Sequence, residues 1–122
     1  MILGVGCDIL MVSRIDSVYR KFGDKFLDRL LTDNEKKLFH DRNDCIYTLA
    51  KLFSAKEAVF KSIGSLVQVM KPREIEITHN SMGVPSVVFY GTTASIIPCS
   101  TAIHLSISDE IDYVVSYSVS CV

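Results

Sequence analysis

Three charged side chains within Phe53–Gly64 have the types and the spacing needed for metal-assisted phosphate chemistry. Glu57 and Lys61 are four residues apart, so on a helix they share one face, and Lys56 directly precedes Glu57. A carboxylate holds a hard cation, and ammonium groups neutralise phosphate oxygens. Glu and Lys at this spacing also form ordinary surface ion pairs worth about 0.3–0.5 kcal/mol. The cluster alone therefore leaves both interpretations open.

The segment around this cluster predicts a long helix with one apolar side. Its apolar residues recur at three- and four-residue steps, the period of an α-helix, at Ile46, Leu49, Phe53, Phe60 and Ile63. We expect the helix to run from Cys45 to Ile63, with Asp44 as its cap and Gly64 at its end. Such a helix would hold the three charged side chains on or beside a face that is packed against a core.

The N-terminal residues predict a strand followed by short helices. Apolar side chains alternate with Gly4, Gly6 and Asp8, which puts Asp8 on the face opposite the apolar row. A helix capped by Ser13 and ended by Gly23 follows, with a predicted buried stripe of Ile15, Val18, Tyr19 and Phe22. A short turn at 26–31 comes next, and the capping box at 32–35 opens a helix that reaches about residue 40.

The second half predicts strands. Two of them, around 75–77 and 84–90, flank a turn at 80–83, and Thr92 or Thr93 caps a short helix. The last third reads as a hairpin with one apolar face, its other face carrying His104 and the hydroxyls of serines that include Ser116, Ser118 and Ser120. The predicted fold class is α+β, an antiparallel sheet packed against one long helix and several short helices.

The composition limits the classes of protein. The chain has 122 residues, 48% of them hydrophobic and 22% charged, which indicates one globular domain and argues against disorder. The net charge of −1 gives no global signal for nucleic acid. Its four cysteines form no Cys-x-x-Cys pair, so we expect reduced thiols and a cytoplasmic location. No apolar run approaches the roughly 20 residues of a membrane helix, so no membrane insertion is expected.

Three segments considered together identify a family. The stretch 4–9, the helix segment from Lys56 to Lys61, and the strand 104–108 resemble, in their order and spacing, the holo-acyl-carrier-protein synthases. These are the small phosphopantetheinyl transferases of bacterial fatty-acid synthesis. The likeness spans nearly the whole chain and includes Arg14, Gly83 and Pro85. It implies that residues 1–122 form a single phosphopantetheinyl transferase domain with that family's fold.

The resemblance also implies a reaction. A serine hydroxyl of apo acyl carrier protein attacks the β-phosphorus of coenzyme A, phosphopantetheine moves to the serine, and adenosine 3′,5′-bisphosphate leaves. By position, Asp8 and Glu57 correspond to the Mg²⁺ ligands, and Lys61 reaches the same phosphates. Glu57 is the nearest acceptor for the serine proton, either directly or through a water molecule. Lys56 ranks below Lys61 as a phosphate ligand.

The family further implies binding residues beyond the metal site. The residues expected to contact coenzyme A are Asp8, Lys61, Gly64, Pro85, His104 and Ser106. His104 and Ser106 would reach it from a neighbouring subunit of a homotrimer whose active sites lie between subunits, although a lone strand histidine is more often structural. The chain departs from the family at Leu52, where an arginine is usual, and at Leu66, where a glycine is usual.

The resemblance implies that the first helix and the residues just after Gly23 dock the acidic carrier protein, through Arg14, Lys21 and Lys25. Between positions 14 and 29 there are five basic and three acidic residues, so an ordinary solvent-facing charged helix is the alternative.

Two rival functions use the same residues. A metal-dependent nucleotide phosphohydrolase would direct water at phosphorus. A non-catalytic oligomeric module would assemble through the apolar face of the hairpin, with Glu57 and Lys61 merely paired.

Overall fold

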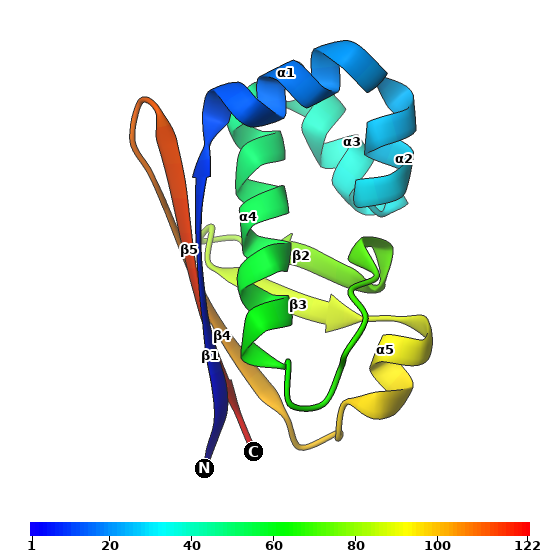
Figure 1. Ribbon diagram of the computed structural model, residues 1–122, viewed down its shortest axis with the longest axis vertical. Helices are drawn as coiled ribbons and strands as arrows, with labels where there is room; N and C mark the ends of the chain where they lie inside the picture. The colour runs from blue at the N-terminus through cyan, green and yellow to red at the C-terminus, as the bar shows by residue number, and fades with distance from the viewer.

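The computed structural model describes residues 1–122 and places helix α4 (Ile46–Ser62) between two antiparallel sheets (Figure 1). The larger sheet has the order β1-β5-β4, formed by Ile2–Met11, Tyr113–Cys121 and Ala102–Asp109. The smaller sheet pairs β2 (Ile75–His79) with β3 (Pro85–Phe89). The predicted α+β class is confirmed, with the strands divided between two sheets instead of one.

The remaining helical segments are short. Helices α1, α2 and α3 lie together at one end of the molecule, whereas η1 and α5 lie beside the smaller sheet (Figure 1); their bounds are Val12–Phe22, Asp24–Leu30, Asp33–Asp41, Pro72–Glu74 and Gly91–Ile96. The capping box that opens α3 is confirmed, because the Thr32 hydroxyl accepts the Glu35 N–H and the Glu35 carboxylate accepts the Thr32 N–H.

Three predicted caps are wrong. Helix α1 starts at Val12, directly after β1, so Ser13 lies inside it. Asp44 accepts a hydrogen bond from the His40 ring at 2.6 Å instead of capping α4. Neither Thr92 nor Thr93 caps α5, because the Glu74 carboxylate accepts the Thr93 N–H. In the last two cases another partner replaces the expected cap: a neighbour four residues earlier for Asp44, and a carboxylate 19 residues earlier for Thr93.

The buried stripe predicted for α1 is only partly correct. Ile15 is buried in the core, but Phe22 is 51% exposed. The core instead gathers apolar side chains from α2, α3, α4 and both sheets, among them Leu27, Phe39, Leu49, Leu52, Ile75 and Val114.

Two glycines let α4 lie directly on β1. A Cβ atom added at Gly6 would come 1.9 Å from the Ala58 carbonyl oxygen, and one at Gly4 would come 2.3 Å from that of Ser62. Real side chains never approach so closely, so only glycine fits these positions. This contact brings the turn of α4 that carries Glu57 against the middle of β1, close to Asp8.

The prediction for the faces of the hairpin is wrong. On β5 the serines at 116, 118 and 120 are buried beneath α4, whereas Tyr113 and Tyr117 are exposed. His104 pairs with Val119, so it lies on the outer, largely apolar face and not with those serines. Close packing of α4 admits only small side chains, and Ser120 Oγ donates to the Ser62 carbonyl oxygen at 2.5 Å.

None of the helices combines the length and the hydrophobicity that crossing a membrane requires.

Candidate active site

Asp8 and Lys61 meet where α4 crosses β1. Asp8 lies on the face of β1 that packs against α4, because its cross-strand neighbour is the buried Ser116. Lys61 Nζ donates to the Cys7 carbonyl oxygen at 2.9 Å and lies 3.5 Å from Asp8 Oδ1. Lys61 thus forms its ion pair with Asp8 and not with Glu57, which removes the simple intrahelical pair as the explanation for these residues.

Glu57 belongs to the same site. Its side chain is half-buried, and loss of solvation raises the pKa of its carboxyl group. The negative charge of Asp8 raises that pKa further, and the ammonium group of Lys61 opposes both effects. Two carboxylates that are distant in the sequence therefore influence each other electrostatically across the contact between β1 and α4.

The carboxylate of Asp8 is incompletely satisfied. Its Oδ2 atom is buried and has no hydrogen-bond partner, and the side chain is only 15% exposed. Two hard oxygen donors, one with an unpartnered oxygen, fit Mg²⁺, which takes one or two carboxylates and completes its shell with water and phosphate. No group of three or more metal-ligating side chains comes together, so a complete cage made only of protein ligands is not formed.

Lys56 points away from this site. It is 0% exposed, and its Nζ atom lies 2.7 Å from Glu35 Oε1 while donating to the carbonyl oxygens of Pro72 and Ile75 at 2.7 and 2.6 Å. Burial lowers the pKa of this ammonium group, and Glu35 opposes that shift. Its lower rank as a phosphate ligand agrees with this placement, since every contact of its charge is within the protein interior.

The other residues predicted to bind coenzyme A are spread over the molecule. Gly64 follows α4 directly after the turn that carries Lys61, with its N–H donating to the Lys61 carbonyl oxygen at 3.4 Å. His104 and Ser106 are exposed on the outer face of β4, opposite the face on which Asp8 lies. One copy of the chain therefore does not bring these two side chains to the carboxylates.

Pro85 lines a basic hollow of about 210 Å³ that was not expected from the sequence. Arg42, Lys51 and His79 also line it, together with Gly83 and Ile107. Burial, and then the charges of Arg42 and Lys51, lower the pKa of His79. Lys51 also lies 3.2 Å from Asp109. The only sequence signal for this hollow was Pro85, because its basic residues come from separate segments.

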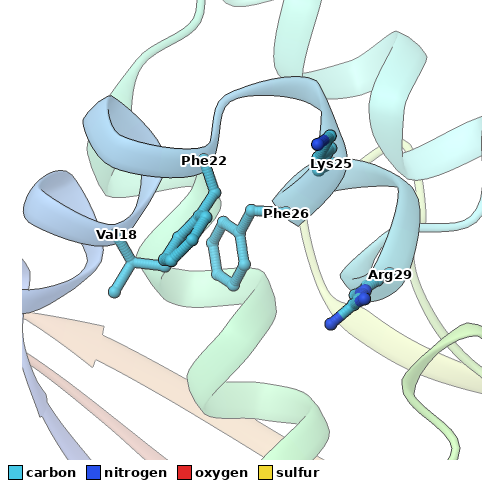
Figure 2. A pocket seen from close by; sticks show the side chains of 5 residues that line it. All are labelled: Val18, Phe22, Lys25, Phe26 and Arg29. Carbon is cyan, nitrogen blue, oxygen red and sulfur yellow. The ribbon is translucent and has the colours of Figure 1, made fainter.

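A groove of about 420 Å³ separates α1 from α2 (Figure 2). Its lining combines three apolar side chains with two basic ones: Val18, Phe22, Phe26, Lys25 and Arg29. Lys21 lies nearby, with its ammonium group 5.2 Å from the centre of the Phe22 ring, and Arg14 is exposed on the same helix. The exposure of Phe22 is explained by this groove, in which the ring is part of the lining.

The sequence matches a known family over most of its length. The model of the 4′-phosphopantetheinyl transferase superfamily matches residues 4–118. The chain belongs to this superfamily. The resemblance noted in the sequence is thereby confirmed, and the match identifies the chain as an enzyme of the phosphopantetheinyl transferase type.

Individual members of the superfamily agree with the match. The holo-[acyl-carrier-protein] synthase of Dechloromonas aromatica is 40% identical over 119 residues, which cover 96% of this chain and 95% of that protein. The crystal structure of the Neisseria meningitidis synthase is 36% identical, with a TM-score of 0.87 and full coverage of both chains. A Bacillus anthracis synthase in complex with CoA (3′,5′-ADP) is 29% identical, with a TM-score of 0.79 and coverage of 98% and 96%.

Proposed function

We propose that this chain transfers the 4′-phosphopantetheine group of coenzyme A to a serine of apo acyl carrier protein, with Mg²⁺, in fatty-acid biosynthesis. Residues 1–122 act as one domain, located in the cytoplasm. The observation that carries the proposal is the meeting of Asp8, Glu57 and Lys61 in a chain of this superfamily. The similar synthase from Bacillus anthracis, described as a complex with CoA (3′,5′-ADP), supports coenzyme A as the donor.

Asp8 and Glu57 are the residues that would hold Mg²⁺, which when bound offsets the negative charge of the diphosphate. Lys61 donates to the phosphate oxygens as charge develops on them. The serine oxygen forms a bond to the β-phosphorus while the bond to adenosine 3′,5′-bisphosphate breaks. The serine proton passes to Glu57, directly or through water.

The basic hollow beside Pro85 receives an anionic group of the nucleotide half of coenzyme A. Arg42 and Lys51 supply positive charge there, although this chain has Leu52 where the family usually has arginine. Gly64 lies near the diphosphate. In a homotrimer formed through the outer sheet face, His104 and Ser106 of one subunit contact the coenzyme held by its neighbour.

The groove between α1 and α2 docks the carrier protein. An acidic, amphipathic helix suits a groove with an apolar lining and a basic rim. Arg14 and Lys21 on α1 and Lys25 on α2 provide the attraction. Charge reversal at Arg14 and Lys21 therefore raises KM for the carrier protein and leaves KM for coenzyme A nearly unchanged.

The proposal is tested by mass spectrometry of apo carrier protein after incubation with coenzyme A, Mg²⁺ and this protein. The expected product is carrier protein that has gained one phosphopantetheine arm. A carrier protein whose acceptor serine is replaced by alanine should stay unmodified, and coenzyme A should stay intact when no carrier protein is added. Breakdown of coenzyme A without carrier protein would instead support the phosphohydrolase, which the similarity to synthases does not favour.

A further inference from the structure

A buried hydroxyl beside Asp8 has no assigned role. Ser116 lies on β5 directly opposite Asp8 in the antiparallel pairing with β1, so both side chains face α4. Ser116 is 0% exposed, and its Oγ atom has no hydrogen-bond partner. The Oδ2 atom of Asp8 is likewise buried without a partner. Two unsatisfied polar atoms thus belong to neighbouring side chains.

The other buried serines of β5 do not share this property. Ser118 Oγ lies 2.8 Å from Ser62 Oγ, and Ser120 Oγ donates to the Ser62 carbonyl oxygen. Tight packing of α4 explains why position 116 holds a small residue, but alanine would satisfy that requirement without a buried hydroxyl. An unsatisfied buried polar group costs about 1–3 kcal/mol, so this hydroxyl needs a further reason.

The two unpartnered groups are complementary. A serine hydroxyl has one donor and rotates freely, whereas a carboxylate oxygen only accepts. Directly opposed residues in an antiparallel pair have Cβ atoms about 4.5–5.5 Å apart, a separation that one hydrogen bond or one bridging water spans.

We propose that Ser116 is a positioning residue, whose hydroxyl donates to Asp8 Oδ2, directly or through one buried water, when the cation site is filled. That bond would fix the orientation of the carboxylate, whose Oδ1 atom lies 3.5 Å from Lys61 Nζ, and so prepare Asp8 to hold the cation. The inference rests on the proposed role of Asp8 as a metal ligand. Carboxylates that ligate metals are commonly held by such hydrogen bonds from neighbouring groups.

The test measures the affinity for Mn²⁺ in the presence of coenzyme A, with electron paramagnetic resonance of Mn²⁺ as the readout. It compares the full, unchanged chain with two matched variants. Ser116→Ala should bind Mn²⁺ about tenfold more weakly, the range seen for residues that support metal ligands. Ser118→Ala, which removes an equally buried hydroxyl from the same strand, should bind Mn²⁺ as the unchanged protein does. Its Tm should fall because Ser62 loses a partner, whereas the Tm of Ser116→Ala should hold or rise.

Activity assays separate positioning from general damage. At saturating Mn²⁺, Ser116→Ala should recover most of its kcat, with KM for coenzyme A unchanged. Unaltered Mn²⁺ affinity in Ser116→Ala would overturn the inference and leave the proposed function standing. Equal weakening in Ser118→Ala would overturn it as well, since packing alone would then explain the loss. If the unchanged protein transferred phosphopantetheine without binding Mn²⁺ or Mg²⁺, the metal site itself would be wrong, and the inference with it.

Discussion

Lys56 and Glu57 are consecutive residues of α4, yet they belong to two charged clusters of opposite character. The cluster around Lys56 is closed, because its ammonium group has three partners and both oxygens of Glu35 accept backbone N–H groups, from Thr32 and Ile77. The cluster around Glu57 is open. It places two carboxylates near each other and leaves Asp8 Oδ2 with no partner.

The difference separates a structural use of buried charge from a functional one. In the closed cluster the polar groups satisfy one another and hold α3, α4 and β2 together. In the open cluster two unfavourable contributions remain, carboxylate repulsion and an unpaired oxygen, which the proposed cation and phosphate would relieve. Buried charged side chains that the fold leaves without partners are therefore a better guide to the candidate active site than charged side chains in general.

The largest effect is expected from neutralising the open cluster. Glu57→Gln removes one proposed metal ligand. Loss of a residue that only supports a metal ligand typically lowers metal affinity or activity about 10–100-fold, so loss of the ligand itself should lower activity by more than about 100-fold. Stability should hold or increase, since the repulsion from Asp8 is relieved. Turnover in a carrier-protein assay and urea unfolding measure the two effects. Full activity in a folded Glu57→Gln protein would contradict the functional interpretation of this cluster.

Breaking the closed cluster should give the opposite result. Lys56→Met leaves the buried carboxylate of Glu35 without its ion pair, and disruption of a buried pair costs about 3–5 kcal/mol of unfolding free energy. Lys61→Met is the matched control. Lys61 is half-exposed, so its loss should cost at most about 1 kcal/mol while lowering turnover. Equal destabilisation by the two substitutions would erase the distinction between the clusters.

The sequence predicts periodic elements well and non-local contacts poorly. The 3.6-residue period of α4 and the alternation of β1 are local signals, and both elements form close to the expected bounds. Alternation along β5 predicted two different faces but did not show which face packs against α4. The serine face packs there because the glycines of β1 bring α4 close to the sheet and because the Ser62 carbonyl oxygen accepts the Ser120 hydroxyl.

The candidate site likewise has features that the sequence predicts and features that depend on non-local contacts. Glu57 and Lys61 were singled out by their spacing on the predicted helix, whereas the role of Asp8 as their partner came from the family resemblance. The contact of β1 with α4 brings the three residues together. The direction of Lys56 could not be predicted, because Glu35 and two backbone carbonyls from another segment converge on it. The unpartnered oxygen of Asp8 likewise depends on side chains that only the folded chain brings together.

A moderate effect is expected where α4 rests on β1. Gly6→Ala would place a methyl group 1.9 Å from the Ala58 carbonyl oxygen, so the helix must shift, at about 1–3 kcal/mol for overpacking. The shift also separates Asp8 from Glu57 and should reduce turnover. Gly64→Ala is the stability control, because its new methyl group meets its nearest atom at an ordinary 3.4 Å. Denaturation midpoints compare the two, and similar midpoints would show that the contact is not close-packed.

The smallest effect on stability is expected at Glu74, a carboxylate that, unlike Asp8, has its hydrogen-bond acceptors satisfied. Glu74 accepts the N–H of Thr93 and hydroxyl hydrogen bonds from Thr92 and Thr93, and these bonds lower its pKa from 4.5 to about 2. Because the folded-state pKa is depressed, the stability that the ionised group contributes is complete above 4.5 and is lost as the pH falls through about 2.

Glu74→Gln should therefore lower the urea midpoint at neutral pH, and the gap from the unchanged protein should close as the pH falls from 4.5 toward 2. Glu110→Gln, at an exposed carboxylate after β4, controls for the general loss of one negative charge. If the difference between the two urea midpoints widened on acidification, ionisation of Glu74 would destabilise the folded protein, as burial and the charge of Asp8 make it do for Glu57. The contrast between satisfied and unsatisfied carboxylates would then no longer hold.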